Sequence, residues 1–585
     1  MAAGFAAGLA AEGFAAGFAT AFEALALKAG FRAGAAATGF AAAGLLFDAA
    51  AGPFGPAFLT SFDDFDDLDN FDPIFIFPLL ARAMRCVHRV LSCSMEFMSA
   101  SPGARPRGVK IVCTLGPASS DEASLGALIE AGLDVARLNF SHGSHAEHAA
   151  RARMLRRLAT DAGRSVALLQ DLQGPKVRIG AMAQGARLVT EACFELQRGA
   201  GTGDARRAFL DDPLFFEEVE PGDRLLLADG TIELLAERCD GDRLSCRVLS
   251  GGVLTSRKGV NLPRGLLRRP VLSDADRADL AFGVEIGVDL VAVSYVRSAE
   301  DLRSVRRALH EQGVATPLVA KIETAAAIEN LEEILEATDA VMLARGDLAL
   351  ETPFERVPME QKRILLAARR RGRPVITATQ LLASMVSEPR PTRAEVNDVA
   401  NAVLDGTDAV MLSEETAVGA HPAHAAETMA RIIVATEQDA PDEIRGAEGL
   451  PPEIYALGVV AESAAWTARA IGARAIVAWT RGGLGARLAS RASRRLPILA
   501  PARTREAARL LGAVRAVTPI PALDGSIDPA VVRALLGACA NEDAPLVLLG
   551  HDVGPLGRRI PWMRVAQLDE PAAWCRDPAG GGSQR

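Results

Sequence analysis

Eight short runs rich in β-branched residues alternate with amphipathic helical stretches in the central part of this 585-residue chain. They lie in segments 109–178 and 268–440, whose combined length of about 240 residues is close to the roughly 250 of an eight-stranded parallel barrel. Strands that alternate with helices favour parallel pairing through crossovers. The sequence therefore predicts an α/β fold with a (β/α)8 TIM barrel. The runs are VKIVCT, VARLN, SVALLQ, VDLVAVS, PLVAKIE, AVMLA, PVITAT and AVMLS.

Two further regions interrupt or follow this alternation. Between the third and fourth runs, short alternating segments with turn signals such as PGDRLLLADG predict an all-β domain inserted after strand 3. After the barrel, a long Ala-rich helix and five strand-like runs predict an α/β domain with a small doubly wound sheet. The predicted ranges are 106–178 and 268–440 for the barrel, 179–267 for a β-barrel lid, and 450–585 for the C-terminal domain.

Residues 1–105 differ in composition from the rest of the chain. They open with the quasi-repeat GFAAGLAAEGFAAGFATAF and continue into the acidic tract SFDDFDDLDNFD. The glycines weaken a helix and the repetition offers no varied core, so the expectation is a low-complexity extension that is disordered or not native. Met95 and Met98 stand just before the composition turns ordinary and could serve as starts.

Overall composition excludes several classes of protein. The net charge of −9 argues against a nucleic-acid-binding surface. No uninterrupted apolar run of about 20 residues lies beyond the Ala/Gly-rich start, which argues against a membrane span. The eight cysteines are scattered without zinc-like spacing, as expected of reduced thiols in a cytoplasmic protein.

The stretch 318–348 carries the clearest chemical signal. Its two strand-like runs flank an amphipathic helical segment; the first leads into Lys321 and Glu323, and the second into Asp347. If both strands are parallel, the two carboxylates lie side by side at their carboxyl ends, with Lys321 on the same face as Glu323. This predicts a site for a hard cation beside a fixed positive charge. A plain surface cluster of ion pairs is the alternative.

Other polar side chains follow the remaining strands at the same end of the predicted barrel. Several cations beside groups of oxygen ligands suit phosphoryl transfer, because the transferring group is stabilised mainly by positioning and electrostatics. The collected residues are Arg137, Asn139, Ser141, Asp171, Arg178, Lys321, Glu323, Asp347 and Thr379.

The motifs resemble those of the pyruvate kinase family of bacterial type over about residues 107–585. They include KIVCTLGPAS, VARLNFSHG, DLQGPKVRIG, SRKGVNLP, AKIET, MLARGDL, TATQLLASM and PRPTRAEVNDVANAVLDGTDAVMLSEETA. The resemblance implies a phosphotransferase of glycolysis. It would transfer the phosphoryl group of phosphoenolpyruvate to ADP, giving pyruvate and ATP, with Mg²⁺ or Mn²⁺.

The resemblance also implies roles for the residues at the strand ends. Glu323 and Asp347 match the divalent-metal ligands. Lys321 matches the lysine that neutralises the moving phosphoryl group and the enolate oxygen, and Arg137 matches the phosphate-binding arginine.

Two smaller residues belong to the implied substrate site. Thr379 matches the residue near the proton delivered to the enolate carbon, although a structural hydroxyl at a strand end is the alternative. Gly346 would let the backbone approach the substrate carboxylate.

Nucleotide and monovalent-cation sites are implied in the same way. The nucleotide contacts would be Asn139, His142, Arg178 and Lys258, with Lys258 on an inserted domain that closes as a lid. The monovalent-cation site would comprise Asn139, Ser141, Asp171 and Leu172. Potassium-dependent members tend to carry an acidic residue where this chain has Lys176 and a Thr where it has Leu172, so K⁺ is expected not to be required.

Further expectations concern assembly and regulation. The resemblance implies a homotetramer and an allosteric enzyme that binds a phosphorylated effector in the C-terminal domain. The loop 480–485, TRGGLG, is a weak match to a dinucleotide fingerprint and fits better an anion site at a helix N-terminus. In SHGSHAEH, a metal site is discounted because His145 and His148 are expected on a solvated helix start.

Two other functions compete with a kinase. A lyase of the phosphoenolpyruvate/pyruvate barrel group also uses a metal bound by Glu and Asp, but it would not need the β-rich insert with Lys258 or the C-terminal domain. A catalytically silent binding protein of the same fold should have lost Lys321, Glu323 or Asp347, and all three are present.

Deletion of residues 1–94 is expected to change neither turnover nor thermal stability, because the repetitive segment offers no core to pack against the rest. The check is to compare turnover and unfolding midpoint for the full chain and residues 95–585. Loss of soluble, active enzyme on truncation would contradict this prediction and assign the segment a role in packing or targeting.

Overall fold

The structure is a computed structural model. It describes residues 107–263, 269–440, 448–493, 496–522, 526–536, 545–553 and 559–571. The predicted extension 1–105 lies outside the described residues.

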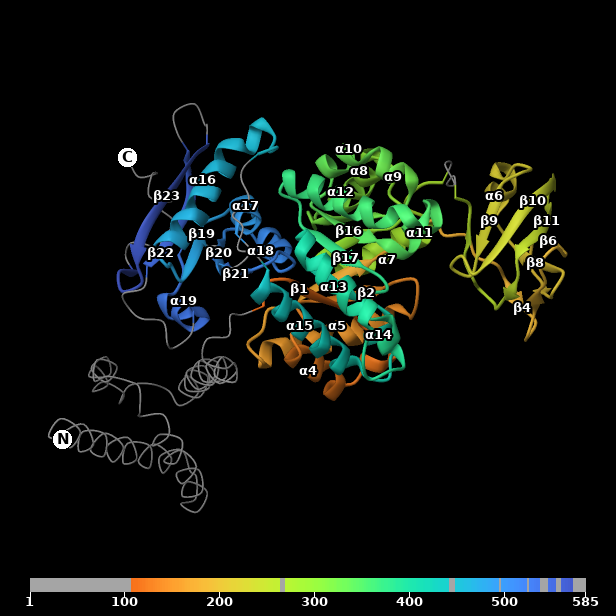
Figure 1. The fold of residues 1–585 in the computed structure, drawn as a ribbon, viewed down its shortest axis with the longest axis horizontal. Helices are drawn as coiled ribbons and strands as arrows, with labels where there is room; N and C mark the ends of the chain where they lie inside the picture. The colour runs from red at the N-terminus through yellow and green to blue at the C-terminus, as the bar shows by residue number, and fades with distance from the viewer. Residues whose placement is uncertain are drawn as a thin grey trace, which may run out of the picture. The chain divides into compact units, whose positions relative to one another are not determined.

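Eight parallel strands close into the predicted barrel in the order β1-β18-β17-β16-β15-β14-β3-β2 (Figure 1). The first and last strands close it, with Lys110 opposite Ala409. Every strand is almost wholly buried because one face fills the barrel and the other packs against helices. The strands are β1 Lys110–Thr114, β2 Val135–Asn139, β3 Ala167–Asp171, β14 Leu290–Val293, β15 Leu318–Ile322, β16 Ala340–Ala344, β17 Val375–Ala378 and β18 Ala409–Leu412.

Helices follow the strands, and several begin at side-chain caps that the sequence supplies. Ser144, Ser273, Ser298 and Thr392 each close a capping box with an acidic residue three positions later. The stretch between β15 and β16, predicted as one helix, is split at Asn330 into two. The barrel helices are α4 Glu122–Glu130, α5 His145–Asp161, α7 Asp274–Glu285, α8 Ala299–Glu311, α9 Ala325–Glu329, α10 Leu331–Ala337, α11 Arg345–Glu351, α12 Val357–Arg370, α13 Arg393–Asp405, α14 Glu414–Ala417 and α15 Pro422–Asp439.

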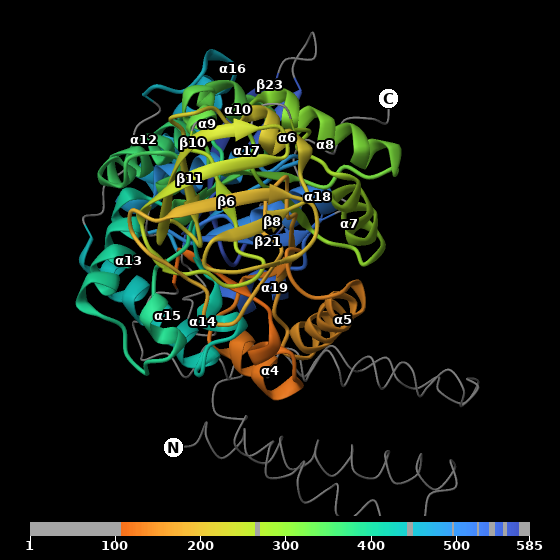
Figure 2. The ribbon, with the colours of Figure 1, turned by 90° about the vertical axis from the view of Figure 1, so that its right-hand side faces the viewer.

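The segment after β3 forms β-rich structure with its own apolar core. Its main sheet has the order β13-β9-β10-β11-β6-β8, and Figure 2 shows β10, β11, β6 and β8 side by side. In the described residues this main sheet is open, since its edge strands β13 and β8 are not paired with each other. The elements are β4 Ala181–Met182, β5 Arg187–Leu188, β6 Cys193–Arg198, β7 Thr202–Gly203, β8 Arg207–Leu210, α6 Pro213–Glu218, β9 Arg224–Leu227, β10 Ile232–Asp240, β11 Arg243–Ser250, β12 Gly252–Val253 and β13 Val260–Asn261.

The C-terminal segment forms an α/β unit around a five-stranded sheet of order β21-β20-β19-β22-β23. Its strands are parallel except for β23, which returns antiparallel to β22 at one edge. The elements are α16 Pro452–Ala470, β19 Ala475–Ala478, α17 Leu484–Ala492, β20 Ile498–Ala502, α18 Arg505–Leu511, β21 Val517–Pro521, α19 Pro529–Leu536, β22 Pro545–Val553 and β23 Arg559–Gln567.

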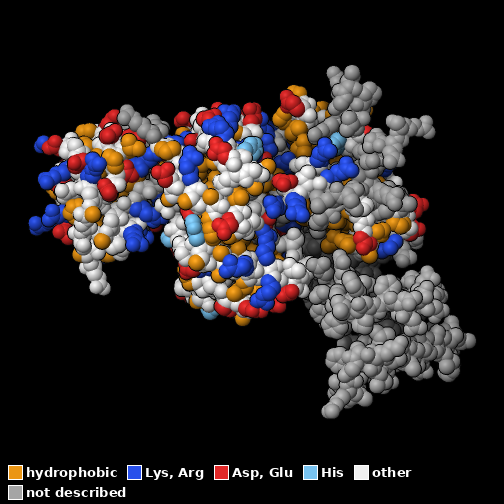
Figure 3. All heavy atoms as spheres, turned by 180° about the vertical axis from the view of Figure 1, so that it is seen from behind, with side chains coloured by type: hydrophobic (Ala, Val, Ile, Leu, Met, Phe, Trp, Pro, Cys, Tyr) orange, Lys and Arg blue, Asp and Glu red, His pale blue; other side chains and the backbone are white. Residues whose placement is uncertain are grey.

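The surface carries charges of both signs. On the face shown in Figure 3, basic and acidic side chains are interspersed over the described residues, as the modest net charge leads one to expect. None of the helices in the described ranges combines the length and apolar character that a membrane crossing would demand.

Candidate active site

The carboxyl ends of the barrel strands bring the predicted cations and carboxylates together around Lys321. Its Nζ donates a hydrogen bond to Ser294 Oγ over 2.8 Å. The same nitrogen lies 3.3 Å from Asp171 Oδ1 and 2.8 Å from Glu323 Oε1. Burial alone would lower the pKa of Lys321, but the charges of the two carboxylates outweigh it and raise that pKa. The ammonium therefore stays charged at any physiological pH.

Asp171 anchors a second cation. Arg137 donates from Nε to Asp171 Oδ2 over 2.7 Å and from Nη1 to Thr114 Oγ1 over 2.9 Å. Asp171 is only 1% exposed, and burial would raise its pKa, but the charges of Lys321 and Arg137 hold that pKa below its usual value. One buried carboxylate thus fixes two cations at neighbouring strand ends.

Glu323 is buried beside Lys321, with one oxygen poorly satisfied. The backbone N–H of Tyr295 donates to its Oε2 over 2.8 Å. Its Oε1 is in ion-pair contact with Lys321 but accepts no hydrogen bond of good geometry. Burial raises the pKa of Glu323; Lys321 opposes this rise and the charge of Asp347 adds to it.

Asp347 lies in the first turn of α11, directly after β16. Lys176 Nζ lies 3.2 Å from its Oδ1 and supplies a third cation at this end of the barrel. Lys176 therefore neighbours Asp347, whereas the ammonium beside Asp171 is that of Lys321.

Glu351, at the end of α11, is a member of the site that the sequence did not reveal. Burial, together with the charges of Asp347 and Glu323, raises the pKa of Glu351 to about 8. The signal available was its position four residues after Asp347 on one helix face. Burial is the larger cause of this rise, and the two neighbouring carboxylates add to it.

These carboxylates fit a divalent cation. An under-coordinated buried oxygen on Glu323 and mutually raised carboxyl pKa values are both relieved by a bound positive charge. No group of three or more His, Cys, Asp or Glu side chains with metal-binding geometry occurs in the described ranges. Two carboxylates that leave the other positions to water or substrate oxygens are the arrangement typical of Mg²⁺.

Thr379 and Gly346 meet at the ends of β17 and β16. Thr379 Oγ1 accepts the Gly346 N–H over 2.8 Å and donates to Ala378 O over 2.7 Å, so its hydroxyl bridges two strand ends. Thr379 has a φ of 69°, a strained conformation for a β-branched residue. Arg345 Nη2 donates to its carbonyl over 2.8 Å and holds it there.

A Cβ at Gly346 would make only ordinary contacts with Thr379, at 3.5 Å and beyond. The protein itself therefore does not require a glycine at this position.

The four residues predicted for a monovalent cation are near one another but already engaged. Asn139 Oδ1 accepts the Ser141 N–H over 3.2 Å, and both oxygens of Asp171 face cationic side chains. Leu172 has an apolar side chain, and its carbonyl accepts a hydrogen bond from Ser294 Oγ over 2.7 Å.

The predicted nucleotide contacts are spread over the barrel edge and the insert. Burial lowers the pKa of His142, and the positive charges of the nearby Arg178 and Arg137 lower it further. Arg178 Nη1 donates to Arg257 O over 3.1 Å. Lys258 Nζ lies 3.6 Å from Asp229 Oδ2, within the insert. Lys258 is thus not among the cations grouped around Lys321.

The histidines of SHGSHAEH point to different partners, as expected if they hold no metal. His145 Nε2 lies 2.6 Å from Asp279 Oδ1, and its ring stacks on Phe282. His148 is only 2% exposed and stacks on Phe140, so its predicted solvated position was wrong. Its Nε2 lies 2.9 Å from the carbonyl oxygen of His142, which gives this buried ring nitrogen a partner.

Comparison with protein families matches two models to this chain. Residues 106–426 match "Pyruvate kinase, barrel domain", and residues 459–549 match "Pyruvate kinase, alpha/beta domain".

Curated proteins named pyruvate kinase are similar over most of the chain. One from Mycobacterium intracellulare is 40% identical over 459 residues, which cover 77% of this chain and 96% of that protein. One from Agrobacterium vitis is 42% identical over 464 residues, with the same coverages. Among solved structures, a pyruvate kinase from Cryptosporidium parvum superposes with a TM-score of 0.71 at 30% identity, covering 79% of this chain and 96% of that one.

Proposed function

Because this chain belongs to the pyruvate kinase family, we propose that it transfers the phosphoryl group of phosphoenolpyruvate to ADP, yielding pyruvate and ATP. The observation that carries the proposal is the ammonium of Lys321, held between Asp171 and Glu323 and kept charged. A fixed cation of this kind stabilises charge on a transferring phosphoryl group without reorganisation during the reaction. Family membership excludes the barrel lyase as the primary function.

The two cations anchored on Asp171 have complementary tasks. Arg137 binds the phosphate of phosphoenolpyruvate with Nη2, the guanidinium nitrogen that its contacts with Asp171 and Thr114 leave over. Lys321 neutralises charge that moves between the phosphoryl group and the enolate oxygen. Because Asp171 fixes both, the phosphoryl group is oriented before the reaction starts.

Glu323 and Asp347 are proposed to hold Mg²⁺ or Mn²⁺. The bound ion would act as a Lewis acid on substrate oxygens. Its charge would also keep Glu323 and Glu351 ionised, offsetting the raised pKa values that burial and mutual repulsion impose on them. Lys176 also contacts Asp347, so its ammonium and the bound metal ion would compete for that carboxylate.

The remaining assignments concern orientation. Gly346 would let the substrate carboxylate approach the backbone at α11. Thr379 would stand near the proton delivered to the enolate carbon, and its strained backbone supports a functional rather than a purely structural role. Asn139, His142, Arg178 and Lys258 would contact the nucleotide, with Lys258 arriving when the inserted domain closes. We further propose a cytoplasmic homotetramer.

The direct test is a pyruvate-release assay on the full chain with phosphoenolpyruvate, ADP and Mg²⁺ supplied together or withheld singly. Release that requires all three supports the proposal. Release without ADP indicates a phosphatase or lyase, and no release under any condition indicates a silent binding protein.

Replacing Lys321 by Met is expected to lower turnover about 10³-fold or more, equivalent to about 4 kcal/mol, because the cation acts on transition-state charge. Turnover is measured at saturating substrates, and retention of the fold by circular dichroism. Lys362→Met, at an exposed lysine of α12, is the matched control and should keep full activity. Retention of more than about a tenth of wild-type turnover by the Lys321 variant would refute the assigned role.

Monovalent cations are expected to activate the enzyme weakly or not at all. The ammonium of Lys321 and the guanidinium of Arg137 already supply positive charge at both oxygens of Asp171, and Lys176 does so at Asp347. Initial rates in KCl are compared with rates in tetramethylammonium chloride at constant ionic strength. Strong activation specific to K⁺ would contradict this prediction.

The enzyme is expected to respond little to fructose 1,6-bisphosphate. Thr480, the hydroxyl that remains in the loop 480–485, is buried and accepts the Gly483 N–H over 2.8 Å. Glycines occupy positions 482 and 485, where hydroxyls would be expected to bind the phosphate. At about 1.5–3 kcal/mol for each hydrogen bond to a charged group, two missing bonds cost about two decades of affinity or more.

This prediction is checked by titrating phosphoenolpyruvate at sub-millimolar bisphosphate, with AMP or a pentose phosphate in parallel as the likelier effectors. Gly482→Ser/Gly485→Ser is the matched gain-of-function variant, since a Cβ at either position meets nothing closer than 4.0 Å. A clear fall in half-saturation in the wild type, abolished by Thr480→Ala, would overturn the argument from the glycines.

A further inference from the structure

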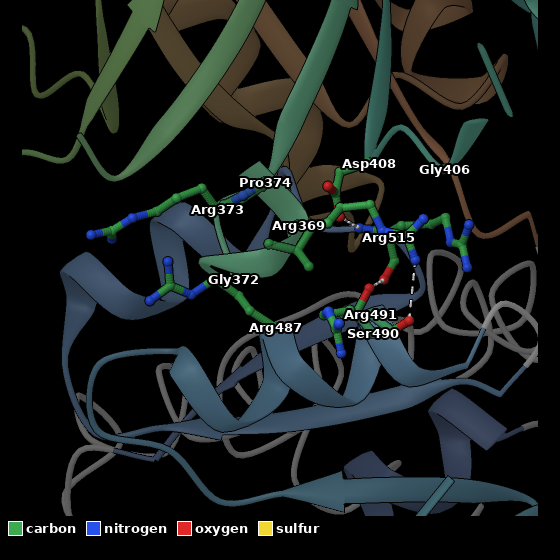
Figure 4. Close-up of a pocket in the computed structure, with 11 residues that line it drawn as sticks. Arg369, Gly372, Arg373, Pro374, Gly406, Asp408, Arg487, Ser490, Arg491 and Arg515 are labelled. Atoms are coloured by element: carbon green, nitrogen blue, oxygen red, sulfur yellow. Dashed lines mark hydrogen bonds between the residues drawn. The ribbon is translucent and has the colours of Figure 1, made fainter. Parts of the chain in front are cut away.

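A cavity lined by five arginines lies between the barrel and the C-terminal α/β unit (Figure 4). Arg369 and Arg373 come from the end of α12 and the turn that follows it. Arg487 and Arg491 come from α17, and Arg515 precedes β21. The cavity encloses about 20 Å³, and the single acidic residue among its described lining is Asp408.

Arg487 is half-buried and has no carboxylate counterion among the described residues. Its Nε and Nη1 are inaccessible to solvent and have no hydrogen-bond partner. Among the described residues, no carboxylate lies within ion-pair distance of its guanidinium. Burial and the charge of Arg373 lower the pKa of Arg487 to about 10, so it remains protonated near neutral pH. Buried donor nitrogens without an acceptor are costly, which indicates that the cavity is built to present Nε and Nη1 of Arg487 to an anion.

Asp408 does not serve as that anion. Its Oδ2 accepts the N–H of Val375 over 3.0 Å, at the start of β17, and its Oδ1 accepts the N–H of Arg515 over 3.2 Å. The carboxylate therefore ties the barrel to the C-terminal unit through backbone groups. Burial raises the pKa of Asp408, which further limits its value as a counterion.

Arg373 lines both this cavity and a second, larger hollow. It has a volume of about 300 Å³, and its charged lining also includes Arg303, Arg306, Glu336 and Asp339. Arg306 is paired with Asp339 at 2.9 Å. The enclosed part has room for one oxygen atom or a water-sized group, and the hollow has room for the rest of a small molecule.

We propose that this arginine cavity binds a phosphate dianion, either inorganic phosphate or the phosphoryl group of a small phosphomonoester. One oxygen occupies the enclosed part against Arg487, and the remainder lies toward Arg373 and the hollow. Planar guanidinium groups suit this task because they donate bidentately to phosphate oxygens. The bound anion supplies the negative charge that no described carboxylate provides to the guanidinium of Arg487.

The site is separate from the catalytic residues and from the loop at Thr480. Pro374 and Asp408 directly precede β17 and β18, so the cavity lies at the amino ends of these strands, opposite to Lys321. Arg487 and Arg491 lie inside α17, beyond residues 480–485. A ligand here contacts both the barrel and the C-terminal unit and so stabilises their association.

The test is isothermal titration calorimetry of the full chain with inorganic phosphate and, in a second arm, with ribose 5-phosphate. Arg487→Met is expected to weaken the saturable binding at least tenfold. Arg533→Met, at an exposed arginine of α19, should bind as the wild type does. Heat that persists in Arg487→Met belongs to other sites, such as the catalytic one, so the difference between the variants isolates this cavity.

The two arms identify the ligand. Binding of both probes with similar affinity indicates free phosphate, and clearly tighter ribose 5-phosphate indicates a phosphomonoester. Equal binding of both probes by the wild type and Arg487→Met would overturn the proposal. If Arg487→Met does not fold, Arg491→Met, which removes a second lining guanidinium, is expected to weaken binding in the same direction.

Thermal unfolding gives an independent check. In phosphate-free buffer, Arg487→Met should unfold at the same temperature as the wild type or higher, because an unpaired charge has been removed. Added phosphate should raise the midpoint of the wild type but not that of the variant. A midpoint that phosphate raises equally in the wild type and the variant would contradict the proposal.

Discussion

The buried carboxylate of Asp171 organises the catalytic end of the barrel. It is almost inaccessible to water, yet its pKa is held low because Lys321 and Arg137 each neutralise one of its oxygens. Neither cation could be buried at this depth alone, and the carboxylate could not remain ionised without them. The three groups come from β2, β3 and β15 and meet only because the parallel strands end at one rim.

The sequence predicted the barrel and the identity of this rim well, because strand spacing and charged residues at strand ends are local patterns. The sequence could not predict which carboxylate each cationic side chain would pair with. Lys176 pairs with Asp347, whereas the ammonium beside Asp171 belongs to Lys321. That choice depends on side-chain directions across neighbouring strands, which no periodicity encodes. Glu351 was missed for a related reason: its altered pKa arises from burial against two other carboxylates.

Tertiary packing explains where the structure differs from predictions that rest on local sequence patterns. His148 follows a helix start rich in polar residues, yet it is buried, and its ring stacks on Phe140 and bonds to a backbone carbonyl. The insert has the alternation of a barrel; in the described residues the edge strands of its main sheet are not paired with each other, and closure is a property of the whole sheet. Lys258 pairs with Asp229 inside the insert, so its contact with a nucleotide depends on closure of that insert.

The arginines at the two ends of the barrel differ in whether their guanidinium nitrogens have partners. At the carboxyl end, Arg137 is satisfied by Asp171 and Thr114, so its position is fixed before any ligand binds. At the amino end, Arg487 has two buried nitrogens without a partner, although Asp408 and Asp339 are near enough to influence its pKa. A charge that is already paired gives preorganisation, whereas a charge left unpaired gives affinity for whatever neutralises it. The amino end therefore has the electrostatic character of a binding site whose occupant comes from outside the described chain.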